Sequence, residues 1–223
     1  MKKALQFRAI QLDLARQMET MDFIRQYIDF CSSNGYNTLF LYLEGRIRTA
    51  SFPYPADHEC YTPEQMRELV DYATARGMDI VPGLACLGHA ELFLKHQELH
   101  ELGELRAGNS GRFENTRSHV LCPSLTSTRD FLERYITDVA AIFPSRYIHI
   151  GGDEAWDIGY CEHCAAKAAT FAGEQQLYLD HLKFCHQIVT EKLHRRMMMW
   201  DDMFEYYTDI VELLPRDIVM TNW

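Results

Sequence analysis

The chain has 223 residues, a formal net charge of −10, and a composition that is 47% hydrophobic and 24% charged. These proportions are ordinary for a globular protein with one sizeable core, so we expect a single domain over residues 1–223. The acidic balance, with no basic run longer than two residues, argues against nucleic acid or an anionic membrane surface as a partner.

Features near the amino terminus and the cysteine count favour the cytoplasm. Arg8 and Asp13 interrupt the stretch that a signal peptide would need to keep apolar, and no window is apolar enough for a membrane span. Seven cysteines, an odd number scattered along the chain, are better explained as reduced thiols than as a disulfide framework. We therefore expect a cytoplasmic protein.

Short apolar runs alternate with longer amphipathic segments, which is the pattern of β/α units that build a parallel sheet. In chain order the expected elements are strand 7–13, helix 20–33, strand 37–43, helix 63–76, strand 79–84, helix 128–143, strand 147–150, helix 175–195, strand 197–200, helix 204–214 and strand 218–223. The helix at 63–76 is the best marked, because Thr62 and Gln65 can form a capping box and Gly77 follows its end.

Six strand–helix units in series correspond to most of a (β/α)8 TIM barrel, whose usual length is about 250 residues. The last two strands of such a barrel would be absent, so we expect the chain to be a fragment that is incomplete at its carboxyl end. Closure by another subunit, or two strands hidden from the pattern, are the alternatives. In a barrel of this kind the site lies at the carboxyl ends of the strands.

The expected strand at 147–150 is followed by Gly151-Gly152-Asp153-Glu154. Adjacent residues on a strand point to opposite faces, so the two acids can share a site only if the backbone turns, which the glycines permit. A general acid beside a second carboxylate is one explanation, since neighbouring carboxylates resist joint ionisation. An aspartate that caps the next helix beside a solvated glutamate is the other.

The run His-Ile-Gly-Gly-Asp-Glu at 149–154 resembles the signature of glycoside hydrolase family 20, the β-N-acetylhexosaminidases. Further segments resemble that family's first, third and fifth strands in the right order: Arg-Ala-Ile-Gln-Leu-Asp-Leu-Ala-Arg at 8–16, Pro82 with Gly88-His89, and Trp-Asp-Asp at 200–202. The resemblance covers nearly the whole chain.

This resemblance implies a retaining glycosidase in which the substrate's own 2-acetamido group is the nucleophile. Glu154 would be the general acid and then the general base, and Asp153 would orient the acetamido group and stabilise the charge that develops on it. The substrates would be glycans or glycoconjugates with a terminal β-linked N-acetylglucosamine or N-acetylgalactosamine, without cofactor or metal.

The resemblance also assigns substrate-binding roles. Arg8 would hold sugar hydroxyls, His89 would hydrogen-bond Glu154, and Trp200 would wall the acetamido pocket. Independently of the resemblance, Trp223 ends an expected strand, where an aromatic face can stack on a sugar. Each type of residue also has an ordinary explanation, namely a surface ion pair for the arginine, a structural histidine, and core packing for the tryptophans.

After the second strand, many members of the family carry two aspartates, where this chain has Glu44. An acidic role at that place therefore shifts to Glu44, as in the intracellular, domain-poor branch that the chain resembles more. No counterpart exists for the family's seventh-strand tyrosine or for groups from its eighth strand, so we expect the 223-residue chain alone to be inactive or weak.

Two rival functions stay open. One is a sugar-binding barrel without catalysis. The other is a metal-dependent barrel hydrolase with four ligands: His89, His149, Asp153 and Glu154.

Cys161 and Cys164 have the two-residue spacing that can place two thiolates on one metal. Tetrahedral zinc needs two more ligands, for which Cys122, His119 or His163 are candidates. Reduced thiols that pack in the core are the favoured explanation, ahead of structural zinc or a redox pair.

Overall fold

The computed structural model describes residues 5, 7–106 and 109–223. Its strands form one parallel sheet in the order β1-β2-β3-β4-β5-β6, which is the order expected for consecutive units of a β/α barrel. The strands are β1 (Ala9–Asp13), β2 (Thr38–Tyr42), β3 (Asp79–Gly83), β4 (Tyr147–His149), β5 (Arg196–Trp200) and β6 (Val219–Thr221). All six expected strands are confirmed, and β1 and β6 form the two edges of the described sheet.

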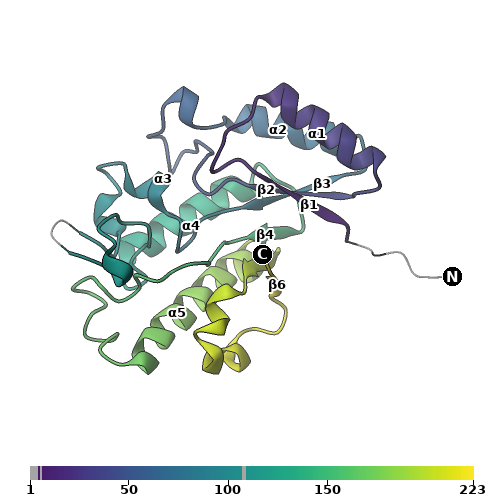
Figure 1. Cartoon of the computed structure of the whole chain (residues 1–223). Helices are drawn as coiled ribbons and strands as arrows, with labels where there is room; N and C mark the ends of the chain where they lie inside the picture. The colour runs from purple at the N-terminus through teal and green to yellow at the C-terminus, as the bar shows by residue number, and fades with distance from the viewer. Residues whose placement is uncertain (1–4, 6, 107–108) are drawn as a thin grey trace.

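Four of the five expected helices are confirmed. They are α1 (Met21–Ser33), α2 (Pro63–Thr74), α4 (Thr126–Ala140) and α5 (Phe171–His186), and α5 continues as a π-helical turn at Gln187–Lys192. The expected capping box of α2 is present, with the Thr62 hydroxyl accepting from the Gln65 N–H and the Gln65 side chain accepting from the Thr62 N–H. In Figure 1, α1 and α2 lie side by side over β1 to β3, and α5 lies on the far side of β4.

The helix expected at 204–214 is wrong. Two short 3-10 helices, Asp202–Glu205 and Thr208–Leu213, stand in its place. Tyr207 breaks the helix between them with a non-helical backbone, because its side chain is buried: the ring packs 5.2 Å from that of Tyr178 and the hydroxyl donates to Glu174. Packing of one aromatic side chain here outweighs the helical pattern.

The long connection after β3 contains the short helix α3 (Glu91–Leu94) and two 3-10 turns, His100–Leu102 and Arg112–Glu114. Another 3-10 turn, Asp57–Glu59, lies between β2 and α2. No helix of the described residues is long and apolar enough to cross a membrane.

The core has two parts on the two faces of the sheet. The larger part packs the helices against the sheet and includes Leu39 and Leu41 of β2. The smaller part lies on the opposite face and consists of Ala15, Phe40, Tyr42, Val81, Met198 and Trp200. Alternation along β2 produces this division, since successive side chains point to opposite faces.

Candidate active site

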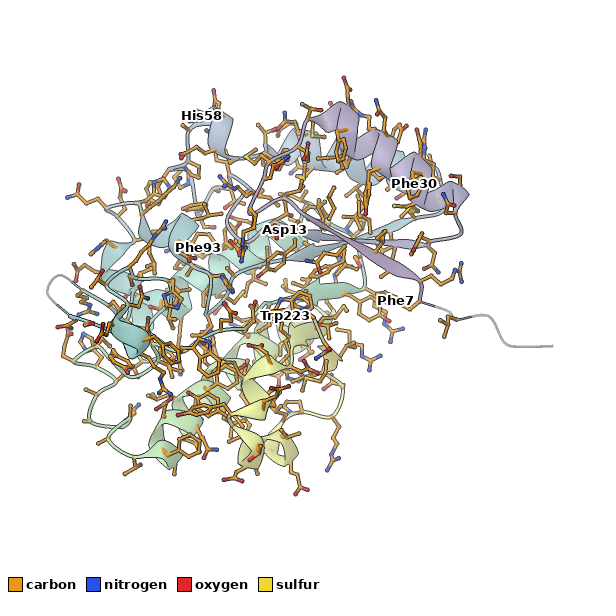
Figure 2. The ribbon with its side chains drawn as sticks, in the orientation of Figure 1. Phe7, Asp13, Phe30, His58, Phe93 and Trp223 are labelled. Carbon is orange, nitrogen blue, oxygen red and sulfur yellow. The ribbon has the colours of Figure 1, made fainter. Side chains whose placement is uncertain are left out.

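A cavity of about 290 Å³ opens where the strands end, above the smaller core. Its lining residues come from β1, β2, β5 and the segments that follow the strands: Gln11, Asp13, Arg16, Tyr42, His89, Asp153, Glu154, Trp200 and Trp223. Figure 2 labels Asp13 at the end of β1 and Trp223 beyond β6, the contributions of the two sheet edges. The carboxyl end of a parallel sheet is where α/β proteins build their sites.

The turn after β4 brings two adjacent acids into this cavity. Gly151 and Gly152 have φ values of 72° and 93°, and Glu154 follows with φ 45°. A side chain at Gly151 would place its Cβ 2.6 Å from the carbonyl oxygen of Leu84, so glycine is needed there for space as well as for conformation. The backbone turns between Asp153 and Glu154, and both side chains line the same cavity.

The two carboxylates have different surroundings. Asp153 is 6% exposed, with Oδ2 3.2 Å from Nε2 of His89, while Oδ1 is buried and accepts no hydrogen bond from any described residue. The Glu154 side chain is 42% exposed, and its Oε2 lies 3.3 Å from the same nitrogen. His89 Nε2 therefore lies between the two acids, and one oxygen of Asp153 is buried without a hydrogen-bond partner in the described chain.

On its other side His89 meets an ion pair between the exposed Arg16 and the buried Glu44. Its Nδ1 lies 3.2 Å from Nη2 of Arg16 and 4.0 Å from Oε1 of Glu44, and Arg16 and Glu44 are paired with each other. Burial lowers the pKa of His89, but the hydrogen bond to Asp153 and the charges of Asp153 and Glu44 outweigh burial and raise this pKa to about 9. The imidazole is thus cationic at neutral pH and can donate from Nε2 to the acids.

Burial also acts on Glu44, which is 4% exposed and has a left-handed φ of 51°. Desolvation raises the pKa of this carboxyl to about 7, against the opposing charges of Arg16 and His89. The Glu44 and His89 side chains lie at the limit of an ion pair.

Asp202, in the 3-10 turn after β5, fixes the backbone of the acid pair. Its Oδ2 accepts the backbone N–H of Glu154 at 3.0 Å. Burial raises the pKa of Asp202 to about 6, although this hydrogen bond acts in the opposite direction. The main chain at Glu154 is therefore held from β5 as well as from β4.

An aromatic wall closes one side of the cavity. The Trp200 ring is 5% exposed and meets Tyr42 edge-on, with centroids 6.1 Å apart. Trp200 Nε1 and Tyr42 Oη are buried, and neither has a hydrogen-bond partner within the described part of the chain. Trp223 lines the cavity from the other edge of the sheet and is 67% exposed. The wall thus presents apolar ring faces and two buried polar groups, Trp200 Nε1 and Tyr42 Oη, that make no hydrogen bond within the described chain.

The model of the glycosyl hydrolase family 20 catalytic domain matches residues 5–223. The chain belongs to glycoside hydrolase family 20. It is 27% identical to a β-hexosaminidase of Vibrio furnissii over 97% of this chain and 39% of that protein. It is also 25% identical to the β-hexosaminidase subunit beta of Felis catus, over 95% of this chain and 41% of that protein.

Solved structures of the family share the fold. An exo-β-N-acetylglucosaminidase of Vibrio harveyi in complex with N-acetylglucosamine superposes with a TM-score of 0.81 at 21% identity, over 98% of this chain and 38% of that one. A β-N-acetylhexosaminidase of Bacteroides fragilis gives a TM-score of 0.75 at 25% identity, over 98% and 46%. This family 20 chain therefore has the fold of a partial TIM barrel, and it spans less than half the length of these relatives.

Five of the seven expected site residues line the cavity: His89, Asp153, Glu154, Trp200 and Trp223. Glu44 lies behind His89, next to the lining residues.

Arg8 is the expected site residue that the structure does not bring to the cavity. It precedes β1 at the amino end of the sheet, where its guanidinium donates to the backbone oxygens of Leu5 and Gly35. Side chains on a strand alternate, and since Gln11 and Asp13 face the cavity, Arg8 falls on the other face with Ile10. The arginine in the cavity is Arg16.

Gln11, Asp13, Arg16, Tyr42 and Asp202 are site residues that the sequence did not single out. Alternation along β1 was the available signal for Gln11 and Asp13. Asp13 Oδ1 accepts the N–H groups of Ala15 and Arg16 at 2.9 and 3.0 Å, which turns the chain after β1 and directs Arg16 toward Glu44.

His149, one of the four ligands in the metal-dependent alternative, already makes hydrogen bonds within the protein. It is fully buried, and burial lowers its pKa to about 3, so the ring is neutral. Nδ1 accepts the N–H of Gly151 at 3.1 Å, which leaves Nε2 to donate to Thr221 at 2.8 Å. Both ring nitrogens already have partners within the protein, so His149 cannot bind a metal beside Asp153 without losing one of them.

Proposed function

We propose that this chain carries the catalytic site of a β-N-acetylhexosaminidase, which removes terminal β-linked N-acetylglucosamine or N-acetylgalactosamine from glycans or glycoconjugates. The observation that carries the proposal is the unequal acid pair: Asp153 with a buried, unpartnered oxygen and Glu154 with a half-exposed carboxyl, both next to His89. The names of the relatives, which are β-hexosaminidases, support it.

Asp153 handles the substrate's nucleophile. Its carboxylate lines the cavity, where it can accept the N–H of a 2-acetamido group and so direct the acetamido carbonyl oxygen toward the anomeric carbon. As that oxygen attacks, positive charge spreads over the new oxazolinium ring. The Asp153 carboxylate lies beside that ring in a water-poor site and stabilises the charge.

Glu154 moves the proton. In the first step its carboxyl donates a proton to the glycosidic oxygen as the bond to the leaving group breaks. In the second step the carboxylate takes a proton from water, whose oxygen attacks the anomeric carbon and reopens the oxazolinium to the acetamido group. Two displacements at one carbon retain its configuration.

The aromatic wall suits the rest of the acetamido group. The Trp200 ring offers an apolar surface for the methyl group, and the unpartnered Tyr42 hydroxyl and Trp200 Nε1–H are donors without acceptors. The carbonyl oxygen is one acceptor in an acetamido sugar that suits these donors.

Fluorination of the substrate tests this mechanism. Aryl N-acetylglucosaminides whose acetyl group carries one, two or three fluorines have a progressively poorer nucleophile, so kcat/KM of the protein should fall stepwise along the series. Asp153→Asn should lower kcat/KM, and the exposed Asp180→Asn on α5 is the matched control, expected to behave as wild type. A rate indifferent to fluorination contradicts acetamido participation.

A cytoplasmic location, and substrates rather than nucleic acid or membranes as partners, are further proposals. They rest on the net charge of −10 and on seven cysteines that are all free in the structure.

A further inference from the structure

A cluster of four metal-ligating side chains lies outside the cavity. Its members, Glu104, Cys122, Cys161 and Cys164, are buried, and their ligand atoms all lie within 4.8 Å of one another. Cys122 Sγ is 3.3 Å from Cys161 Sγ and 3.5 Å from Cys164 Sγ. Among the described histidine, cysteine, aspartate and glutamate side chains, these four form the one group close enough to share a metal ion.

Backbone contacts hold the cluster together from two loops. An antiparallel bridge between Gly103 and Leu121 sets Glu104 next to Cys122, with the N–H of Cys122 donating to Leu102 at 2.7 Å. Cys161 and Cys164 lie on one tight turn, where the N–H of Cys164 donates to the carbonyl of Cys161 at 3.1 Å. The ligand atoms thus converge because of main-chain structure, before any ion is considered.

Glu104 provides an independent sign of a missing partner. The residue has no exposed surface, and its Oε2 accepts the N–H of Cys161 at 2.8 Å. Its Oε1 is equally buried but has no hydrogen-bond partner in the described chain. A buried carboxylate oxygen without a hydrogen bond or a cation is costly, so an occupant is expected beside the three sulfurs.

We propose that Cys122, Cys161, Cys164 and Glu104 bind one structural zinc ion. Thiolate sulfurs with one carboxylate oxygen suit tetrahedral zinc, whose bonds to sulfur of about 2.3 Å place two sulfurs about 3.8 Å apart. The two observed separations need to open by only a few tenths of an ångström. Binding replaces the thiol protons, which leave to solvent, and no oxidation is involved.

The proposal departs from the expectation of reduced packing thiols, which are free and buried in the structure. Among the extra ligands considered for the Cys161–Cys164 pair, the geometry favours one. Cys122 joins the pair. His119 instead lies 3.4 Å from Asp157, and His163 lies 3.3 Å from Glu162.

The zinc would join the loop that carries His89 to the loop that carries the acid pair. A second link between the same loops is already present, because Asp157 accepts the N–H of Arg112 at 2.6 Å and the side-chain amide of Asn115 at 2.8 Å. The ion would connect the two loops that line the cavity, and none of its ligands lines the cavity itself.

Metal analysis of the purified protein tests the proposal without reference to glycosidase activity. We expect one zinc per chain in wild type and in Cys60→Ser, which changes a buried free thiol outside the cluster, and loss of zinc in Cys164→Ser. Cobalt substituted for zinc in wild type should show intense sulfur-to-metal charge-transfer absorption, and Glu104→Gln should alter its ligand-field bands. A strong chelator should lower the Tm of wild type but not that of Cys164→Ser.

The cobalt spectrum of wild type keeps the test decisive even if a cysteine variant fails to fold. Protein that holds no zinc, takes up neither zinc nor cobalt, and presents all three cluster thiols to a thiol reagent on unfolding overturns the proposal. A disulfide within the cluster, seen as a loss of two hydrogens by mass spectrometry of protein purified without oxidant, overturns it as well.

Discussion

His89 contacts both members of the acid pair through a single ring nitrogen, and its backbone is in the left-handed region with φ 55°. Glu44 and Glu154 share that region, at 51° and 45°. Non-glycine residues adopt it at a cost of about 1 kcal/mol or more, and such strain collects at functional sites. Three of the six non-glycine residues with positive φ in the described chain thus lie in or next to the cavity.

The charge on His89 has a consequence for stability that can be measured. Its folded pKa of about 9 exceeds the unfolded value near 6.5, so the folded state binds more protons and its stability falls as pH rises through about 9. The carboxyl groups of Asp153, Glu44 and Glu154 and the guanidinium of Arg16 face the ring. Between about pH 7.5 and about pH 9.5 the free energy of unfolding should fall by an amount on the order of 2 kcal/mol.

In His89→Gln this part of the pH dependence should vanish, while the exposed His100→Gln should keep the wild-type slope. Denaturant unfolding at the two pH values measures the difference. The assignment of a cationic His89 fails if His89→Gln and wild type lose the same stability over that range.

At the scale of elements, a close contact between two loops positions the acids. A Cβ added at Gly88, just before His89, would lie 2.0 Å from the backbone oxygen of Asp153. The loops after β3 and β4 therefore meet main chain against main chain, with no room for a methyl group.

Gly88→Ala should push the Asp153 backbone away from β3. We expect roughly a hundredfold loss in kcat/KM, because a shift of about 1 Å in a reacting group has that effect, and a loss of about 1–3 kcal/mol in stability. Gly77→Ala is the control: it has a φ of 71° and open space around it, so it should lose about 1 kcal/mol of stability and no activity. Equal kinetics in the two variants would show that the contact at Gly88 does not position the acids.

The sequence predicts those elements that are stabilised by residues close to one another in the chain. The capping box of α2 and the order of the strands follow from residues close in sequence, and the structure agrees. Arg8 was misplaced because the resemblance named the residue without the face of β1 on which it lies. The helix expected at 204–214 failed because the burial of Tyr207, which depends on α5, is not visible in its own segment.

For the whole molecule, what the sequence could not predict is contact between distant segments. The acid pair and His89 were identified beforehand, but their common nitrogen, the Arg16–Glu44 pair behind it and the Asp202 bond to Glu154 join segments up to 73 residues apart. The convergence of Glu104 and Cys122 with the Cys161–Cys164 turn is of the same kind, since the bridge that aligns the first two is formed by the loop after β3.

The described sheet has two edges, β1 and β6, and Trp223 at the cavity is 67% exposed. A sugar bound there would be covered on the side of β2 to β5 and open toward the edges. We therefore expect weak turnover from these 223 residues, measured as kcat/KM on an aryl N-acetylglucosaminide. Turnover as fast as that of a β-hexosaminidase of full length would contradict this.

The central claim is that Glu154 delivers the proton to the leaving group. The most direct test is whether the loss of activity in Glu154→Gln depends on the leaving group. The measurement is kcat/KM of wild type and Glu154→Gln on two N-acetylglucosaminides, one with a nitrophenyl and one with an unactivated sugar as leaving group. A nitrophenolate departs with little help, whereas a sugar alkoxide needs a proton. The account predicts that Glu154→Gln loses about 10²–10⁴-fold on the unactivated substrate and far less on the nitrophenyl one. Equal losses on both, or no loss on the unactivated substrate, would contradict it.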